Sequence, residues 1–345
     1  MSGVQMRAVA EDEGDQRLDR WFRRHFPQVP QARIEKMCRK GEIRVDGGRA
    51  KPATRLAAGQ SVRVPPLPDT RLGDPERKRP ALSDADAEMM RAAVLYRDDH
   101  LLALNKPPGL PSQGGSGQGG RHVDGLSEAL RFDADDKPRL VHRLDKDTSG
   151  VLLLARSRLA AAALTKAFRA RDTRKIYWAA CAGAPQPRMG TIRFGLVKAG
   201  GDREKMLCVH PDAVERSAGA KHATSDYAVI EGAGGRLSWV ALVPVTGRTH
   251  QLRAHMAEIG HPILGDGKYG GSRQENLGDG WGAGAGGALS RKLHLHARSL
   301  SLTHPVTGAR LALSAPLPEH MARTWEMFDW RPEDAAVDPF ATEPG

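Results

Sequence analysis

The chain has 345 residues, of which 40% are apolar, so it is long enough to fold into two or three domains with substantial cores. It carries a net charge of +11, holds three cysteines without CxxC spacing (Cys38, Cys181 and Cys208), and begins without the apolar core of a secretory signal. No apolar run approaches the ~20 residues that span a bilayer. These features exclude a disulfide framework and a membrane span, and we expect a soluble, cytoplasmic protein with no membrane partner.

Residues 15–66 form the first expected domain. QRLDRWFRRHFP predicts one helix, ended by Pro27, and PQARIEKMCRKG predicts a second, ended by Gly41; in both, the apolar residues recur at helical spacing. EIRVDGG then alternates like a strand and turns at Asp46-Gly47, and SVRV gives a last short strand. We therefore expect two helices packed against a small sheet.

The same segment holds 13 Lys and Arg against 5 Asp and Glu, which points to a polyanionic partner. Its order of helix, glycine, alternating strand, tight turn and closing V-x-V resembles the RNA-binding module named after ribosomal small-subunit protein S-four. The resemblance implies that helix-borne cations hold structured RNA, because such cations neutralise phosphates without reading sequence. The candidate RNA-binding residues are Arg33, Lys36, Arg39, Lys40 and Arg44.

The rest of the chain predicts a linker and a larger domain. Residues 67–90 are rich in proline and mixed charge, which is typical of a linker. Residues 91–322 alternate short apolar runs with hairpin-like loops and a few helices, which favours a mixed, largely antiparallel sheet. The Gly-rich stretch 270–290 is expected to be a flexible insertion, and residues 323–345 a flexible tail. The fold class is therefore α+β.

Within this domain we expect strands at VLYRD, LLALNK, GVLLLA, IYWAACAG, SWVALVPV and LHLHARSLSL, and helices at about 125–132, 158–170 and 249–259. The segment HRLDKDTSGVLLLA leads into one of the strands. There Asp145 stands between Arg143 and Lys146, and TSG is expected to turn the chain into the buried strand Val151–Ala155. Such a carboxylate is either a nucleophile or base held at a cleft, or the anchor of an Asx-type turn.

Three more segments carry candidate groups. LNKPPGLPSQGG places Lys106 at a strand end, KIYWAA places Tyr177 at a strand start, and GRTHQLRAHM places Arg248 and Arg253 about the start of a helix. Together with HRLDKDTSG and GHPILGDGKYG, these segments resemble the RluA/RluC/RluD family of ribosomal RNA pseudouridine synthases. The loop lengths and the 293–308 segment are most similar to the RluC branch, whereas Ser112-Gln113 stands where the family pattern has Val-His.

The resemblance implies an isomerase that needs no cofactor and no metal. The N-glycosidic bond of a uridine is broken and the uracil is rejoined to the ribose through carbon, so no atom is added. Asp145 is then the nucleophile or the base that starts glycal formation, Tyr177 stacks on the uracil and can move a proton, and Arg253, or else Arg248, pairs with Asp145. Arg143 either fills the space left by the extruded base or holds the neighbouring phosphates, and Lys106 helps to form the pocket floor. The implied catalytic residues are Asp145, Tyr177 and Arg253, and the implied substrate contacts are Arg143, Leu144, Lys106 and Arg248.

The implied partner is large-subunit ribosomal RNA or an assembling ribosomal particle, and we expect a monomer. Two alternatives remain at this point: a catalytically inactive RNA-binding assembly factor, and a metal-dependent nuclease, which needs clustered carboxylates. His294 and His296 form an H-x-H pair, but no further zinc ligand at useful spacing accompanies it. We interpret this pair as structural, and His250 and His255 as scaffolding for their motif.

Overall fold

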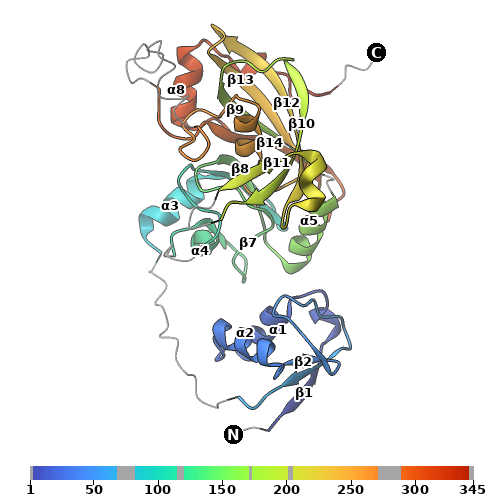
Figure 1. The fold of residues 1–345 in the computed structure, drawn as a ribbon. Coiled ribbons are helices and arrows are strands. Elements are labelled where there is room, and N and C mark those ends of the chain that lie inside the picture. The colour runs from blue at the N-terminus through green and yellow to red at the C-terminus, as the bar shows by residue number, and fades with distance from the viewer. Residues whose placement is uncertain are drawn as a thin grey trace. The chain divides into compact units, whose positions relative to one another are not determined.

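The computed structural model describes residues 3–67, 82–114, 120–170, 173–200, 205–270 and 289–341. The chain divides into two compact units, Met1–Ala81 and Leu82–Gly345. Each unit has its own sheet (Figure 1). Within the described ranges, no helix is long and apolar enough to cross a bilayer.

The N-terminal unit packs two helices on a four-stranded antiparallel sheet. Helices α1 (Leu18–His25) and α2 (Gln31–Lys40) bury their apolar stripes, while the cations remain on their outer faces. The expected helix end is confirmed, because Gly41 adopts the left-handed conformation with φ of 71°. The sheet order is β1 (Gln5–Ala8), β4 (Ser61–Val64), β2 (Arg44–Val45) and β3 (Gly48–Arg49).

The expected turn at Asp46-Gly47 joins β2 to β3, and both residues have positive φ, as a tight hairpin requires. Strand β1 lies before residue 15, where the sequence analysis placed the start of this domain. The strand is short, and of its four residues only Gln5 is even half-buried, so the QMRA stretch gives little signal of a buried strand. The strand forms because it pairs with the edge of β4.

The larger unit is built on eleven strands within the described residues. Nine follow one path, β11-β10-β12-β13-β9-β14-β8-β6-β5, with β15 beside β14 and β7 beside β8. The pairs are antiparallel except for β14 with β8. The strands are β5 (Val94–Arg97), β6 (Leu101–Lys106), β7 (Arg139–Leu140), β8 (Ser149–Ala155), β9 (Arg174–Ala182), β10 (Met189–Lys198), β11 (Met206–Val209), β12 (Lys221–Ala233), β13 (Leu237–Pro244), β14 (Leu295–Thr303) and β15 (Arg310–Ser314).

The helices cover separate parts of this sheet, as Figure 1 shows for α3, α4 and α8. The α-helices are α3 (Asp84–Ala92), α4 (Val123–Leu126), α5 (Arg158–Ala170), α6 (Gln251–Glu258) and α8 (Glu319–Met327). Short 3-10 helices span Glu11–Glu13, Ser127–Leu130, Pro211–Arg216 and Pro332–Asp334. The mixed, mostly antiparallel sheet and the six strands expected from the sequence are thus confirmed.

Two expected boundaries differ from the structure. Helix α3 occupies the second half of the expected linker, because Ser83 caps it and Met90 is fully buried under the sheet. The expected flexible tail is instead ordered to residue 341. Helix α8 and the segment after it bury Trp325 and Trp330 against Trp239 of β13, with ring centroids 5.6 and 6.3 Å apart. Residues 271–288 of the expected insertion and 68–81 of the linker lie outside the described residues.

The join between β8 and β14 depends on Gly150. The expected TSG turn is wrong, because Ser149 and Gly150 already belong to β8, and the turn closes earlier with a Thr148 N–H to Asp145 carbonyl bond of 3.2 Å. Gly150 pairs with Ala297 across the parallel join, at φ of 104°. A side chain at position 150 would overlap the Ala297 carbonyl oxygen and lie 2.7 Å from its nitrogen. Only glycine therefore allows the two strands to meet.

Gly150→Ala is expected to lower the free energy of unfolding by at least about 2 kcal/mol, since backbone strain and an overfilled site each cost about 1–3 kcal/mol. Gly232→Ala is the matched control, because Gly232 also lies in a strand, and an added Cβ there has no heavy atom within 4 Å. Urea denaturation of both variants checks the prediction. Equal losses at the two positions would contradict it.

Candidate active site

The larger unit contains a cleft of about 1030 Å³ whose walls come from segments distant in the sequence. The loop 140–148 between β7 and β8 forms one wall, and the end of β13, the loop after it and the start of α6 form another. The start of β9 contributes Tyr177. Asp145 lies on the first wall, and its side chain is 26% exposed. The strand junction described above thus places this carboxylate opposite α6.

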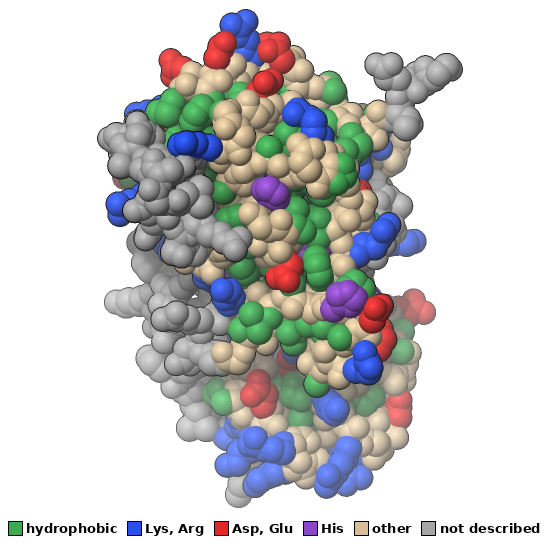
Figure 2. Space-filling model, turned by 45° about the horizontal axis from the view of Figure 1, so that its top comes forward, with side chains coloured by type: hydrophobic (Ala, Val, Ile, Leu, Met, Phe, Trp, Pro, Cys, Tyr) green, Lys and Arg blue, Asp and Glu red, His purple; other side chains and the backbone are tan. Residues whose placement is uncertain are grey.

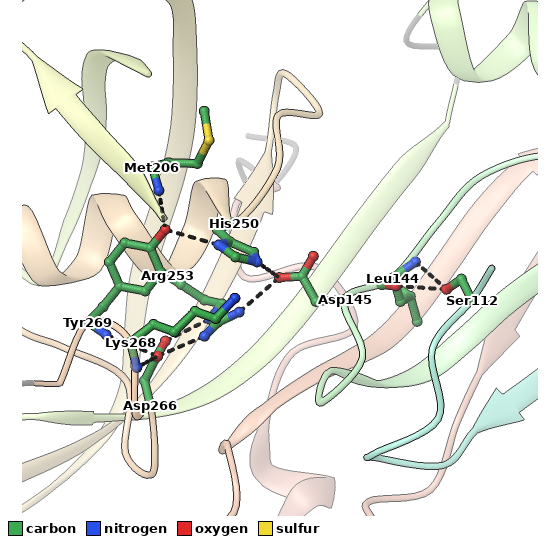
Figure 3. A network of polar contacts seen from close by, with 9 residues as sticks. All are labelled: Ser112, Leu144, Asp145, Met206, His250, Arg253, Asp266, Lys268 and Tyr269. Carbon is green, nitrogen blue, oxygen red and sulfur yellow. Dashed lines mark hydrogen bonds and ion pairs between the residues drawn. The ribbon is translucent and has the colours of Figure 1, made fainter. Parts of the chain in front are cut away.

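Arg253, on α6, holds the Asp145 carboxylate. Its Nη1 donates to Asp145 Oδ2 at 3.2 Å, while Nε and Nη2 donate to the two oxygens of Asp266 at 2.7 and 2.8 Å (Figure 3). Burial disfavours the Arg253 charge, but the hydrogen bonds and charge of Asp266, followed by those of Asp145, raise the pKa of Arg253 above its usual value. The guanidinium is therefore a fixed, permanent cation beside Asp145.

Asp266 is fully buried, and its carboxylate binds Arg253 and does not face the cleft. Its Oδ1 also accepts the backbone N–H groups of Lys268 at 3.0 Å and Tyr269 at 3.2 Å. These bonds satisfy a carboxylate that has no access to water, and they fix the plane of the guanidinium. The GDGKY part of the second motif therefore supports the arginine indirectly.

His250 is a neighbour of Asp145 that the sequence analysis treated only as scaffolding. Its Nε2 lies 3.8 Å from Asp145 Oδ2, and its Nδ1 lies 3.0 Å from the Tyr269 hydroxyl, which accepts the Met206 N–H at 2.8 Å (Figure 3). His250 precedes α6 as its N-cap, with φ of 51°, so helical spacing does not explain this contact. The signal that could have revealed it is the position of His250 in the GRTHQLR motif, three residues before Arg253. His255, by contrast, is fully buried and bonds to Ser225 Oγ at 2.9 Å.

Lys106 does not line the cleft, contrary to the expected floor contact. Its side chain is fully buried, and its ammonium donates to the carbonyl oxygens of Pro107, Leu110 and Lys146 at 2.9, 2.8 and 3.0 Å. Burial lowers the pKa of Lys106 to about 7, and the charges of Asp147 and Asp145 oppose that shift. The lysine thus holds the backbone of the loop that carries Asp145.

The other expected substrate contacts reach the cleft in different ways. Arg143 is exposed at its edge, and Leu144 lines it with a buried side chain. Arg248 also lines it, but its Nε donates to the carbonyl of His222 at 3.3 Å, so Arg253 is the arginine that bonds Asp145. Burial, with the charge of Asp145, raises the pKa of Tyr177, which keeps this phenol neutral in the cleft.

An aromatic pair on the cleft wall was missed from the sequence. His142 stacks on Phe168 with ring centroids 4.4 Å apart, and its Nε2 accepts the Leu153 N–H at 2.9 Å. Burial, followed by the charge of Lys175, lowers the pKa of His142 to about 3, so the ring is neutral and acts as an acceptor. In the HRLD motif the sequence analysis considered the charged residues, whereas the histidine of the motif has a structural role.

Both histidines of the H-x-H pair make hydrogen bonds within the fold, as expected for structural residues. His294 Nε2 lies 2.9 Å from Thr324 Oγ1, and His296 bonds to Ser149 Oγ at 2.8 Å and to the Ala315 carbonyl at 3.1 Å. In the part of the chain that the structure describes, no group of three His, Cys, Asp or Glu side chains could hold a metal ion.

Comparison with known proteins identifies relatives of this chain in sequence and in fold. The family described as RNA pseudouridylate synthase matches residues 100–258. Ribosomal large subunit pseudouridine synthase C from Salmonella typhi is 37% identical over 94% of this chain and 97% of its own length, and the protein of that name from Escherichia coli K12 is 37% identical over 93% and 95%. The solved structure of human RNA pseudouridylate synthase domain containing 4 is 30% identical, with a TM-score of 0.57 over 70% of this chain and 95% of its own.

The fold is that of an RNA-modifying enzyme. The chain belongs to the RNA pseudouridylate synthase family, as the sequence motifs predicted, and its curated relatives carry the name of the predicted branch.

Replacing Lys106 should change how stability depends on pH. An unfolded lysine titrates near 10.5 and the folded one near 7, so between these values the unfolded chain binds more protons. The free energy of unfolding of the parent should therefore rise with pH relative to Lys106→Met, by at most about 1.4 kcal/mol per pH unit, and the difference should be flat below about pH 7. Urea denaturation from pH 6 to 10.5 measures both curves.

Lys146→Met is the control, because Lys146 is exposed in the same loop. Its curve should run parallel to that of the parent. A Lys106→Met curve that also runs parallel would show that the buried ammonium keeps its proton throughout this range.

Proposed function

We propose that this pseudouridine synthase isomerises selected uridines of large-subunit ribosomal RNA, with Asp145 as the catalytic carboxylate. The observation that carries the proposal is the ion pair of Asp145 with a buried, doubly anchored Arg253 at the wall of a wide cleft. The names of the relatives support the choice of RNA. We propose a monomer that acts in the cytoplasm.

The reaction breaks the bond between N1 of uracil and C1′ of ribose and forms a bond between C5 and C1′. N1 gains a proton and C5 loses one, so no redox partner is needed. Asp145 either attacks C1′ to form a covalent ester or removes the C2′ proton to start a glycal route, and both roles require an ionised, accessible carboxylate. Arg253 supports this state, because its charge is permanent and its position is set by Asp266.

The remaining cleft residues fit the handling of an extruded base. Tyr177 offers a neutral aromatic face on which uracil can stack while it rotates. Arg143 and Arg248 are exposed cations on opposite walls, suited to the phosphates on either side of the target or to the space that the base leaves. The inactive-factor alternative is not supported, since the chain is an enzyme of this family and its carboxylate clamp is intact.

The N-terminal unit is proposed to be the S-four-like docking module. Lys36, Arg39, Lys40 and Arg44 are exposed, and Arg33 is half-buried, on α2 and the strand after it. Lys and Arg side chains gather over this unit in the space-filling view (Figure 2). A rigid helix that presents cations binds phosphates without base selection. The module would therefore supply affinity, and the cleft would supply chemistry.

Asp145→Asn is expected to reduce pseudouridine formation by more than about 10³-fold, because a neutral amide can neither attack ribose nor accept its proton. RNA affinity should remain within a few-fold of the parent. Tritium release from C5-labelled uridine RNA measures the reaction, and filter binding measures affinity. Asp147→Asn is the matched control, as an exposed carboxylate two residues away. A near-normal rate for Asp145→Asn would refute the mechanism.

Replacing Lys36, Arg39 and Lys40 together by Gln should weaken RNA binding and make its salt dependence shallower. The slope of log K against log salt should fall in magnitude by about 2 to 3, since each lost phosphate contact removes about 0.7–0.9. Fluorescence anisotropy on a ribosomal RNA fragment at several salt concentrations gives the slope.

The control removes the same charge from the other unit by replacing three exposed cations, Lys166, Arg216 and Arg323. If that variant changes the slope as much, then net charge rather than the N-terminal unit governs binding.

A further inference from the structure

The backbone on both sides of Asp145 is held by a single loop that follows β6. After Asp145, the Lys146 carbonyl accepts the Gly109 N–H at 2.9 Å and the Lys106 ammonium at 3.0 Å. Before Asp145, the Leu144 backbone bonds to Ser112. The loop 106–112 thus fixes the residue before the carboxylate and the residue after it.

Ser112 makes the more specific of these contacts. Its Oγ donates to the Leu144 carbonyl oxygen at 2.7 Å and accepts the Leu144 N–H at 3.0 Å, as the right-hand side of Figure 3 shows. One hydroxyl therefore satisfies both backbone groups of one residue, which a side chain with a single donor and free lone pairs can do. Ser112 is only 3% exposed and Leu144 only 5%, so water does not compete freely for these groups.

The serine is itself held by helix α4. The Asp124 N–H donates to the Ser112 carbonyl at 3.0 Å, and the Val123 N–H donates to the Pro111 carbonyl at 2.9 Å. Leu110 and Leu144 belong to the same buried cluster as Val123. Ser112 therefore connects the backbone next to Asp145 to a segment that is itself held in place by α4.

Asp145 is consequently fixed from two directions. Its carboxylate is held by Arg253 at 3.2 Å, from one half of the sheet, and its backbone is tied to Ser112, from the other half. The two supports share no residue. Loss of the backbone tie would let the loop 140–148 shift, and the carboxylate would then lose its position relative to the cleft while the guanidinium stayed in place.

We propose that Ser112 is a positioning residue for catalysis, which sets the reach of Asp145 into the cleft through the Leu144 backbone. The proposal rests on the proposed role of Asp145. Ser112 does not touch substrate in this scheme. Its removal leaves two buried backbone groups without their partner, and the loop relieves this cost by moving.

The test is Ser112→Ala in the full-length enzyme, assayed for pseudouridine formation on a ribosomal RNA fragment. We expect kcat to fall on the order of 10- to 100-fold, because a displacement of about 1 Å at a reacting group has effects of this size. KM and the RNA dissociation constant should stay within about 2-fold, since no RNA contact is lost. Ser112→Thr, which keeps a hydroxyl, should recover part of kcat.

Ser238→Ala is the matched control for general destabilisation. Ser238 is also fully buried in this unit and donates to a backbone carbonyl, that of Gly183 at 2.7 Å, but it has no bond to the loop 106–112 or to α4. The proposal is supported if Ser112→Ala loses kcat at a melting temperature where Ser238→Ala keeps it. It is overturned if Ser112→Ala keeps the parent kcat, or if both variants lose kcat in proportion to stability, and this comparison decides the matter even if Ser112→Thr does not fold.

Failure here is distinguishable from failure of the proposed function. If Asp145→Asn is inactive and Ser112→Ala is fully active, only the positioning role is lost. If Asp145→Asn is active, the mechanism itself is wrong, whatever Ser112→Ala does.

Discussion

The rest of the site depends on the ion pairs that the guanidinium of Arg253 makes with two carboxylates. The guanidinium lies between a fully buried carboxylate, Asp266, and a partly exposed one, Asp145. A buried ion pair is costly to desolvate, and removing one partner leaves an uncompensated charge that costs still more. Asp266 uses both oxygens on Nε and Nη2 of the guanidinium, and the third nitrogen, Nη1, donates to Asp145. One side chain therefore both neutralises the buried Asp266 and orients Asp145, the proposed catalytic carboxylate.

The sheet explains how Arg253 and Asp145, 108 residues apart, come together. The two halves of the sheet meet where β8 runs parallel to β14, at Gly150 and Ala297. This contact allows β8 to begin beside β14, and the loop before β8 then projects toward α6. The absence of a side chain at Gly150 thus helps to determine the position of Asp145, five residues earlier. A strand junction that looks purely structural determines which walls can form one cleft.

The local features were predictable, because local chemistry specifies them. The left-handed Gly41, the Asp46-Gly47 hairpin and the buried run after Asp145 all follow from residue type and spacing. The long motifs identified the family and brought Arg253 to attention. What the sequence could not supply were long-range pairings. Nothing in the sequence near Gly150 indicates that Ala297 is its partner. Lys106 was expected on the pocket floor, because its sequence position at a strand end does not reveal the three carbonyl oxygens that surround its ammonium. Ser112 had been noticed only as a departure from the family pattern.

The C-terminal segment has a spectroscopic consequence. Four tryptophans meet in one cluster, with ring centroids 4.6 Å apart for Trp178 and Trp239 and 5.1 Å for Trp325 and Trp330. The N-terminal unit contains a single tryptophan, Trp21. Indoles packed this closely exchange excitation energy and emit from an apolar environment, so release of α8 would change the fluorescence of this cluster. The intrinsic fluorescence of the native protein is therefore weighted toward the larger unit, to which the N-terminal unit adds the single indole of Trp21.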